Sequence, residues 1–190
     1  MGKKVLVAMS GGVDSSVAAW VLLREGYDVA GVTMNFGTLT EGDQKRSCTS
    51  AAIDDAKKVC DHFNIPHYVF DYASQLEEKV IADFVSEYQK GRTPNPCIKC
   101  NRHLKFGSLL DKALSMKFDF LATGHYAAIT KDEKGYCLVR PKDKKKDQTY
   151  FLYSIPYERL VNILFPLAHL TKDEVIALAD FLQRLVHGVI

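Results

Sequence analysis

The sequence has little of what marks the special classes of protein. Among its 190 residues are one tryptophan and five cysteines, and no apolar run approaches the roughly 18 residues that a membrane span needs. The 25 lysines and arginines nearly balance 23 aspartates and glutamates, so the net charge is only +2 and no overall charge demands nucleic acid. These absences exclude a disulfide scaffold, a disordered chain and a membrane protein. The ordinary composition and the length predict one globular domain with a sizeable core.

Cysteine usage indicates the compartment. The five cysteines, an odd number, include one C-x-x-C pair, Cys97 and Cys100. The basic N-terminus is followed too early by Ser10-Gly11-Gly12 to form a signal peptide. We therefore expect a cytoplasmic protein with reduced thiols, and metal or redox chemistry at the pair.

Apolar runs alternate with amphipathic segments. The runs predict parallel strands at 4–9, 29–34, 67–72 and 118–123. Helical spacing predicts helices at 15–24, 49–63, 75–89 and 104–116, and the capping-box pattern Thr171-x-x-Glu174 opens a last helix through Leu185. Residues 127–130 and 136–140 predict a hairpin. This order predicts an α/β fold, a Rossmann-like parallel sheet with helices on both faces.

The strongest motif joins the first strand to the first helix. Ser10-Gly11-Gly12-Val13-Asp14-Ser15-Ser16 combines two glycines, hydroxyls and free helix amides, which together suit a phosphate. It is neither the G-x-x-x-x-G-K-[ST] loop nor G-x-G-x-x-G. Asp14 would repel a phosphate unless Mg²⁺ accompanies it. The alternative is a glycine-rich turn whose Ser15 or Asp14 caps the helix.

This loop resembles that of the PP-loop ATP pyrophosphatase superfamily, whose members split ATP between the α and β phosphates. Four further segments narrow the resemblance to the tRNA-specific 2-thiouridylase family: residues 31–34, 91–107, 122–126 and 146–152. The resemblance implies that residues 1–190 form the family's ATP-binding domain. The implied activity replaces the C2 oxygen of the wobble uridine of tRNA with sulfur, using ATP and Mg²⁺.

The resemblance also implies residue roles. ATP would be held by Ala8, Met9, Ser10, Gly11, Gly12, Val13, Asp14 and Ser15, with Met34 and Gly124 beside the nucleotide. The target base would meet Asn95, Pro96 and Cys97, and Cys100 matches the first catalytic cysteine. The tRNA would be contacted by His125, Lys146, Asp147 and Gln148 within a segment at about 126–153.

The residue types around Cys100 fit this chemistry. Adenylation turns a poor leaving oxygen into AMP, and a persulfide or bound sulfide then supplies sulfur. The flanking cations Lys99, Arg102 and His103, and a helix expected to start just after Cys100, predict a lowered thiol pKa. A sulfur-relay protein or a cysteine desulfurase would be the donor partner, while the lysines at 142 and 144–146 suit tRNA phosphates or form a solvated turn.

The C-x-x-C pair has several readings. Many relatives carry aspartate at the position of Cys97, so the pair departs from the commoner pattern. It predicts a disulfide switch, two ligands of an iron–sulfur cluster, a zinc site with His103 as a third ligand, or a plain thiol pair. A zinc site usually needs four ligands, and no second C-x-x-C is present.

Two alternatives to thiolation remain. Family members continue into a central domain, which carries a second catalytic cysteine, and a C-terminal β-barrel, neither of which follows Ile190. The chain is therefore either a thiolating enzyme, a different adenylating PP-loop enzyme, or an incomplete module that binds ATP and tRNA and transfers no sulfur.

Overall fold

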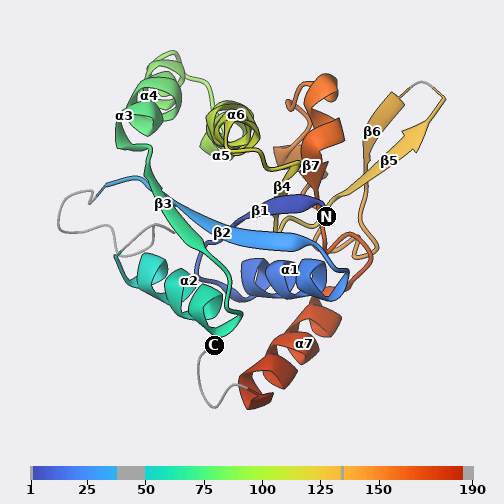
Figure 1. Ribbon diagram of the computed structural model, residues 1–190. Coiled ribbons are helices and arrows are strands. Elements are labelled where there is room, and N and C mark those ends of the chain that lie inside the picture. The colour runs from blue at the N-terminus through green and yellow to red at the C-terminus, as the bar shows by residue number, and fades with distance from the viewer. Residues whose placement is uncertain (1, 38–49, 134, 186–190) are drawn as a thin grey trace.

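A computed structural model describes residues 2–37, 50–133 and 135–185. Its centre is a parallel sheet in the order β3-β2-β1-β4-β7 (Figure 1). The strands are β1 Lys4–Ala8, β2 Asp28–Asn35, β3 His67–Asp71, β4 Phe120–Thr123 and β7 Ile163–Leu164. The four predicted strands are confirmed, and the α/β fold class with them. The fifth, β7, was not predicted because two residues carry no readable pattern.

Helices cover both faces of this sheet, as predicted (Figure 1). One face carries α1 Val13–Arg24 and α2 Ser50–His62, and α7 Lys172–Leu185 packs against α1. The other face carries two longer helical stretches. The first is α3 Ala73–Leu76, η1 Glu77–Ile81 and α4 Ala82–Gln89; the second is α5 Pro96–Lys99, η2 Cys100–Leu109 and α6 Leu110–Ser115.

The second of these stretches begins eight residues earlier than the predicted helix at 104–116. Asn95 caps it, since its Oδ1 accepts a hydrogen bond of 3.0 Å from the backbone N–H of Cys97. Pro96 occupies the first turn, where its missing N–H costs nothing. Cys100 therefore lies inside a helix, in its π-helical part, and not before the start of one.

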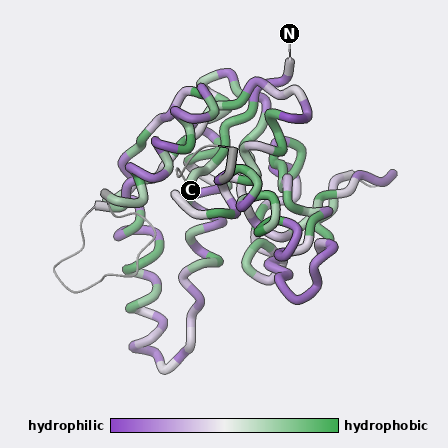
Figure 2. Tube along the Cα trace, turned by 90° about the horizontal axis from the view of Figure 1, so that it is seen from below, coloured by the Kyte–Doolittle hydropathy of each residue, from purple (hydrophilic) through white to green (hydrophobic). Residues whose placement is uncertain are grey.

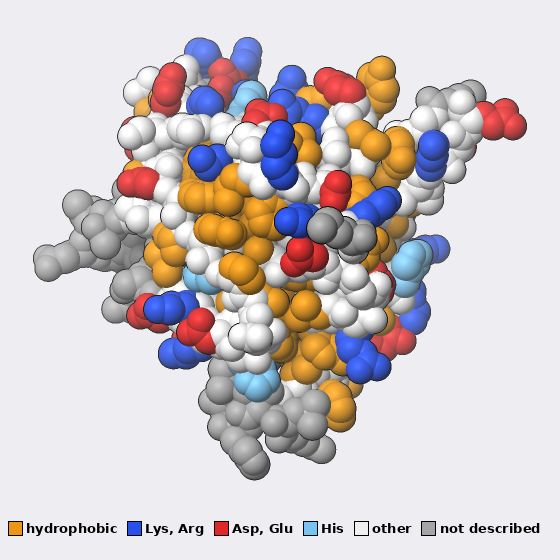
Figure 3. All heavy atoms as spheres, in the orientation of Figure 1, with side chains coloured by type: hydrophobic (Ala, Val, Ile, Leu, Met, Phe, Trp, Pro, Cys, Tyr) orange, Lys and Arg blue, Asp and Glu red, His pale blue; other side chains and the backbone are white. Residues whose placement is uncertain are grey.

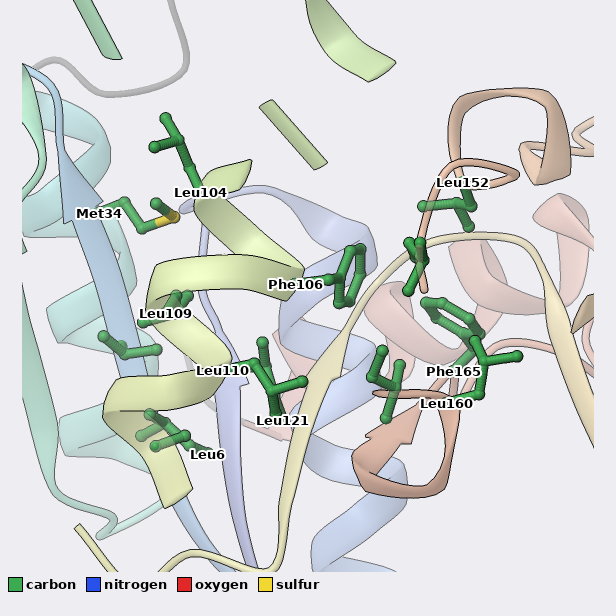
Figure 4. Close-up of a cluster of buried hydrophobic side chains, with 14 of the residues drawn as sticks. Leu6, Met34, Leu104, Phe106, Leu109, Leu110, Leu121, Leu152, Leu160 and Phe165 are labelled. Atoms are coloured by element: carbon green, nitrogen blue, oxygen red, sulfur yellow. The ribbon is translucent and has the colours of Figure 1, made fainter. Parts of the chain in front are cut away.

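Alternation along β1 divides the core. Leu6 faces the η2–α6 side, while Val5 and Val7 face α1 and α2. Figure 4 shows the buried cluster that contains Leu6. In this cluster, leucines and Phe106 of η2 and α6 pack against the strands. The tube in Figure 2 is mostly hydrophobic in the interior and hydrophilic toward the outside, and Figure 3 shows charged side chains around a hydrophobic central area of one face. Cys60 is fully buried in the cluster on the other face of the sheet, which contains Val5 and Val7.

The remaining elements lie beside β4. The antiparallel hairpin of β5 Ala128–Asp132 and β6 Gly135–Val139 confirms the prediction and extends away from the body (Figure 1). Cys137 is exposed on this hairpin. The short helices η3 Thr149–Phe151 and η4 Tyr157–Asn162 follow. The capping box at α7 is confirmed, because Thr171 N–H donates to Glu174 Oε2 at 2.6 Å and Glu174 N–H donates to Thr171 Oγ1 at 3.3 Å.

Within the described ranges, no helix combines the length and the apolar character needed to cross a membrane.

Candidate functional site

A pocket of about 220 Å³ opens at the carboxyl ends of the central strands. The chain runs from β1 outward to β3 and then returns to place β4 on the other side of β1. Ligands of open parallel sheets bind where the strand order reverses in this way. The pocket is lined by Ala8, Met9, Ser10, Asp14, Ser15, Val32, Met34, Phe36, Lys105, Thr123, Gly124, His125 and Gln148. Seven of the residues expected to hold ATP are therefore brought together here.

The loop after β1 is closed by its own hydroxyls. Ser15 Oγ lies 3.2 Å from both the backbone N and Oγ of Ser10, and it donates to Gly12 O at 2.9 Å. Gly12 is the N-cap of α1, and no side chain accepts a cap hydrogen bond there. The capping alternative for Ser15 or Asp14 is thus wrong, and no side chain caps the first amides of α1, which suits an anion site.

Two glycines permit close approaches around this loop. Gly11 has φ of +75°, and a Cβ there would lie 2.6 Å from the carbonyl oxygen of Ala52 in α2. A Cβ on Gly124, just after β4, would lie 2.8–2.9 Å from backbone atoms of Asp14 and Ser15. Gly11, Gly12 and Val13 shape the loop without lining the pocket.

Asp14 makes two short hydrogen bonds at the pocket wall. Its Oδ1 accepts from the Tyr126 hydroxyl at 2.9 Å and from the Lys172 ammonium at 2.6 Å. Burial and the bond to Asp14 raise the pKa of the Tyr126 hydroxyl, which therefore stays protonated and donates. From the sequence, we expected Mg²⁺ to offset the negative charge of Asp14. In the structure, the Lys172 ammonium also offsets this charge.

The pocket lining also includes two residues predicted to meet tRNA, His125 and Gln148. His125 Nδ1 lies 2.7 Å from Thr123 Oγ1, and its ring packs on Phe106 and Phe165. Burial, and then the charge of Lys105, hold the pKa of His125 well below its usual value, so the ring is neutral at pH 7. Gln148 lies in the same pocket.

The other predicted tRNA and base contacts lie elsewhere. Asn95 and Pro96 line a separate groove against α4, together with Phe84 and Tyr153. Asp147 lines a third depression, where it pairs with Arg140 at 3.1 Å and accepts two hydrogen bonds from Thr149; Lys146 is exposed.

The structure corrects the disulfide prediction for Cys97 and Cys100. The four described cysteines are all free, with Cys97 exposed and Cys100 half-buried against the core. Among the described residues, no group of three or more histidines, cysteines, aspartates or glutamates is arranged to hold a metal. The structure thus gives no support to an iron–sulfur cluster. Cys48 lies outside the described residues.

The expected lowering of the Cys100 pKa is also wrong. Burial raises the pKa of this thiol above its usual value, because the helix carries it into the core. The cation that opposes this shift is Lys105, one turn further along the same helix, and not the sequence neighbours Lys99, Arg102 and His103. Lys105 also lines the pocket, so one positive charge bears on both the thiol and the pocket.

We predict that Lys105→Met shifts the pH profile of Cys100 alkylation to higher pH. Because alkylation requires the thiolate, its rate rises with pH through the thiol pKa, and losing Lys105 removes a charge that favours the thiolate. Iodoacetamide labelling, followed peptide by peptide in a Cys97→Ser background, measures the shift. Lys99→Met is the matched control, since Lys99 pairs with Asp83 at 3.2 Å. An unchanged profile for Lys105→Met would contradict the assignment.

The oxygen groups of the pocket suit magnesium arriving with a polyphosphate. Mg²⁺ favours one or two carboxylates together with phosphate oxygens and water. Asp14, with the hydroxyls of Ser10 and Ser15 beside it, offers such a set. Asp14 would hold the ion, and the ion would neutralise phosphate charge.

Sheet order, phosphate loop and switch-point pocket together define the class of protein: a PP-loop domain of the Rossmann-like α/β fold. Residues 3–186 match the sequence model of the family described as tRNA methyl transferase HUP domain. The tRNA-specific 2-thiouridylase MnmA 1 of Syntrophus aciditrophicus is 61% identical over 173 residues, covering 91% of this chain and 46% of that protein. That of Clostridium botulinum (strain Eklund 17B / Type B) is 47% identical over 189 residues, covering 98% and 52%.

The chain belongs to this HUP-domain family, and it is similar to curated tRNA-specific 2-thiouridylases. It spans about half the length of the curated relatives it matches. A 4-thiouridine synthetase, solved in complex with RNA and ATP, has the same fold with a TM-score of 0.62, 17% identity and coverage of 94% of this chain and 40% of that one. The glutamine-dependent NAD⁺ synthetase of Acinetobacter baumannii does so with a TM-score of 0.60, 14% identity and coverage of 100% and 31%.

Lys105, Tyr126 and Lys172 are among the residues that sequence reasoning did not place in the site. Lys105 carries no signal beyond its place in a basic stretch, because only the helix geometry turns it to the pocket. Tyr126 and Lys172 are 112 and 158 residues from Asp14, so their bonds need the tertiary fold.

Proposed function

We propose that this chain carries out the ATP-dependent half of tRNA 2-thiolation: adenylation of the C2 oxygen of a wobble uridine. The observation that carries the proposal is the phosphate loop at the sheet's switch point, in a chain 61% identical to a 2-thiouridylase. The solved relative with RNA and ATP has the same fold, which supports this combination of ligands.

In the proposed reaction the loop binds the polyphosphate of ATP. The amides at the start of α1 and the hydroxyls of Ser10 and Ser15 hold phosphate oxygens, and Met34 and Gly124 border the nucleotide. The uridine C2 oxygen attacks the α-phosphorus, the bond to the bridging oxygen of the β-phosphate breaks, and pyrophosphate leaves. Lys105, at the pocket wall, stabilises the charge that develops on the α-phosphate.

Sulfur transfer would follow from the Cys100 side. A donor protein delivers sulfur as sulfide or as a persulfide, which attacks C2, and AMP leaves with the former C2 oxygen. Where a persulfide attacks, a second thiol then attacks its inner sulfur, so that the S–S bond breaks, the 2-thiouridine is released and a disulfide remains for an external thiol to reduce. The groove at Asn95 and Pro96 would receive the target nucleotide, while His125 and the segment 146–148 contact the tRNA. The exposed Cys97 and the half-buried Cys100 lie in consecutive turns of one helix, so both thiols are within the same neighbourhood.

The proposal is tested by AMP and pyrophosphate release from ATP and Mg²⁺. The reaction is run with unmodified tRNA whose wobble base is uridine, and with the same tRNA carrying a wobble cytidine. We expect AMP release that requires the uridine tRNA. ATP binding without uridine-dependent AMP would contradict the proposal and favour an ATP- and RNA-binding module. AMP release that ignores tRNA would favour another adenylating substrate.

A further inference from the structure

Two donors converge on a single oxygen of Asp14. The Tyr126 hydroxyl and the Lys172 ammonium both bind Oδ1, and neither bond involves Oδ2. The Asp14 side chain is 38% exposed and that of Lys172 is 27% exposed. An ion pair so accessible to water contributes little to stability, so folding alone gives little reason for it. The position of Asp14 in the pocket wall gives a functional reason for the ion pair.

Tyr126 is connected to the segment 142–148 by hydrogen bonds of its backbone. Its ring is buried in the cluster between α1 and α7. Its backbone N–H donates to Gln148 Oε1 at 2.8 Å, and its carbonyl accepts from Gln148 N–H at 2.9 Å. A displacement of Gln148 therefore acts on Tyr126, whose hydroxyl reaches Asp14.

Lys172 is tied to the same segment. It is the first residue of α7, and its backbone N–H donates to Asp143 Oδ2 at 2.9 Å. Lys142 reinforces the junction by binding both carboxylate oxygens of Glu174, at 2.7 and 2.9 Å. The Lys172 ammonium also lies 6.0 Å from the centre of the Tyr126 ring, within cation–π range.

We propose that Tyr126 and Lys172 are positioning residues for the Asp14 carboxylate, through which the segment 142–148 is linked to the magnesium–nucleotide site. The proposal rests on the proposed function, because it takes ATP with Mg²⁺ as the ligand of the pocket. Holding Oδ1 fixes the rotamer of Asp14 and directs Oδ2 to the ion, while Lys172 limits the repulsion between the carboxylate and the phosphates. RNA bound along 142–148 then alters how firmly Asp14 is held.

The test measures ATP binding by calorimetry across a Mg²⁺ titration, so no thiolation is needed. Tyr126→Phe and Lys172→Met are each expected to raise the Mg²⁺ concentration for half-maximal ATP binding about tenfold, the worth of one charge-assisted hydrogen bond. Lys172→Arg keeps the charge and should restore most of the affinity. The matched controls are Tyr157→Phe and Lys58→Met, both exposed and remote from the pocket, which should leave the midpoint unchanged.

The link is tested by repeating the titration with an unmodified tRNA anticodon stem-loop. We expect it to shift the Mg²⁺ midpoint of the wild-type chain and of both controls, and to lose this effect in Tyr126→Phe and Lys172→Met. Variants that keep the wild-type midpoint and the wild-type response would overturn the inference. So would variants that lose melting temperature without moving the midpoint, since that describes a structural role. A wild-type chain that binds no ATP at any Mg²⁺ concentration would instead overturn the proposed function, and this inference with it.

Discussion

Asp14→Asn is expected to lower the rate of AMP formation by about 10²–10³-fold, the usual loss when an electrostatic group is removed from a reacting centre. The substitution keeps the size of the side chain and can still accept from Tyr126 and Lys172, so the fold should persist. It removes the negative charge that would hold the ion carrying the polyphosphate. The loss is measured by comparing the rates of tRNA-dependent AMP release by the wild-type chain and by Asp14→Asn at saturating ATP.

Asp54→Asn is the control for this substitution, because Asp54 is an exposed carboxylate on α2 away from the pocket. It should retain full activity. If Asp14→Asn retained activity within a few-fold of the control, Asp14 would have no role in handling the nucleotide.

Gly124→Ala is expected to weaken ATP binding at least tenfold, for a steric reason. The added methyl would lie 2.8–2.9 Å from the backbone of Asp14 and Ser15, where real Cβ contacts essentially never occur. Backbone cannot yield as a flexible side chain does, so the first turn of α1 must shift, and the phosphate amides shift with it. Calorimetric titration with ATP and Mg²⁺ gives the affinity.

Gly91→Ala separates this close approach from ordinary glycine strain. Gly91 has φ of +74° and open space around its Cβ position, so alanine there is strained without touching the pocket. This variant should lose some stability and keep its ATP affinity. Equal losses of affinity in the two variants would show that the contact of β4 with α1 does not set the geometry of the loop.

The sequence predicted those parts of the fold that rest on local pattern. The buried strands are apolar runs, the helices have amphipathic spacing, and the phosphate loop is one contiguous motif between a strand and a helix. The capping box at Thr171 and Glu174 was likewise readable, since both partners lie within one turn. The pocket forms beside this loop because the parallel order brings the ends of β1 and β4 to one edge.

Errors arose where a local pattern was read without its tertiary setting. Cations next to Cys100 in sequence predicted a lowered pKa, yet burial against the core dominates and raises it. For the C-x-x-C pair the disulfide was one of several predicted alternatives, yet both cysteines are free in the helix that begins at Pro96, which agrees with the plain thiol pair. The two hydrogen-bond partners of Asp14 could not be predicted from local sequence either. Tyr126 and Lys172 come close to Asp14 only in the folded chain, where β4 and α7 bring them to the pocket.

The most direct test of the account follows the oxygen atom of the target base. A tRNA carrying ¹⁸O at C2 of its wobble uridine is incubated with the chain, ATP, Mg²⁺ and a sulfide donor in unlabelled water, and the AMP is analysed by mass spectrometry. If the C2 oxygen attacks the α-phosphorus and is then displaced at C2, the AMP carries ¹⁸O. AMP formed at a tRNA-dependent rate without the label would contradict the account, because water and not the uridine would then have received the adenylyl group.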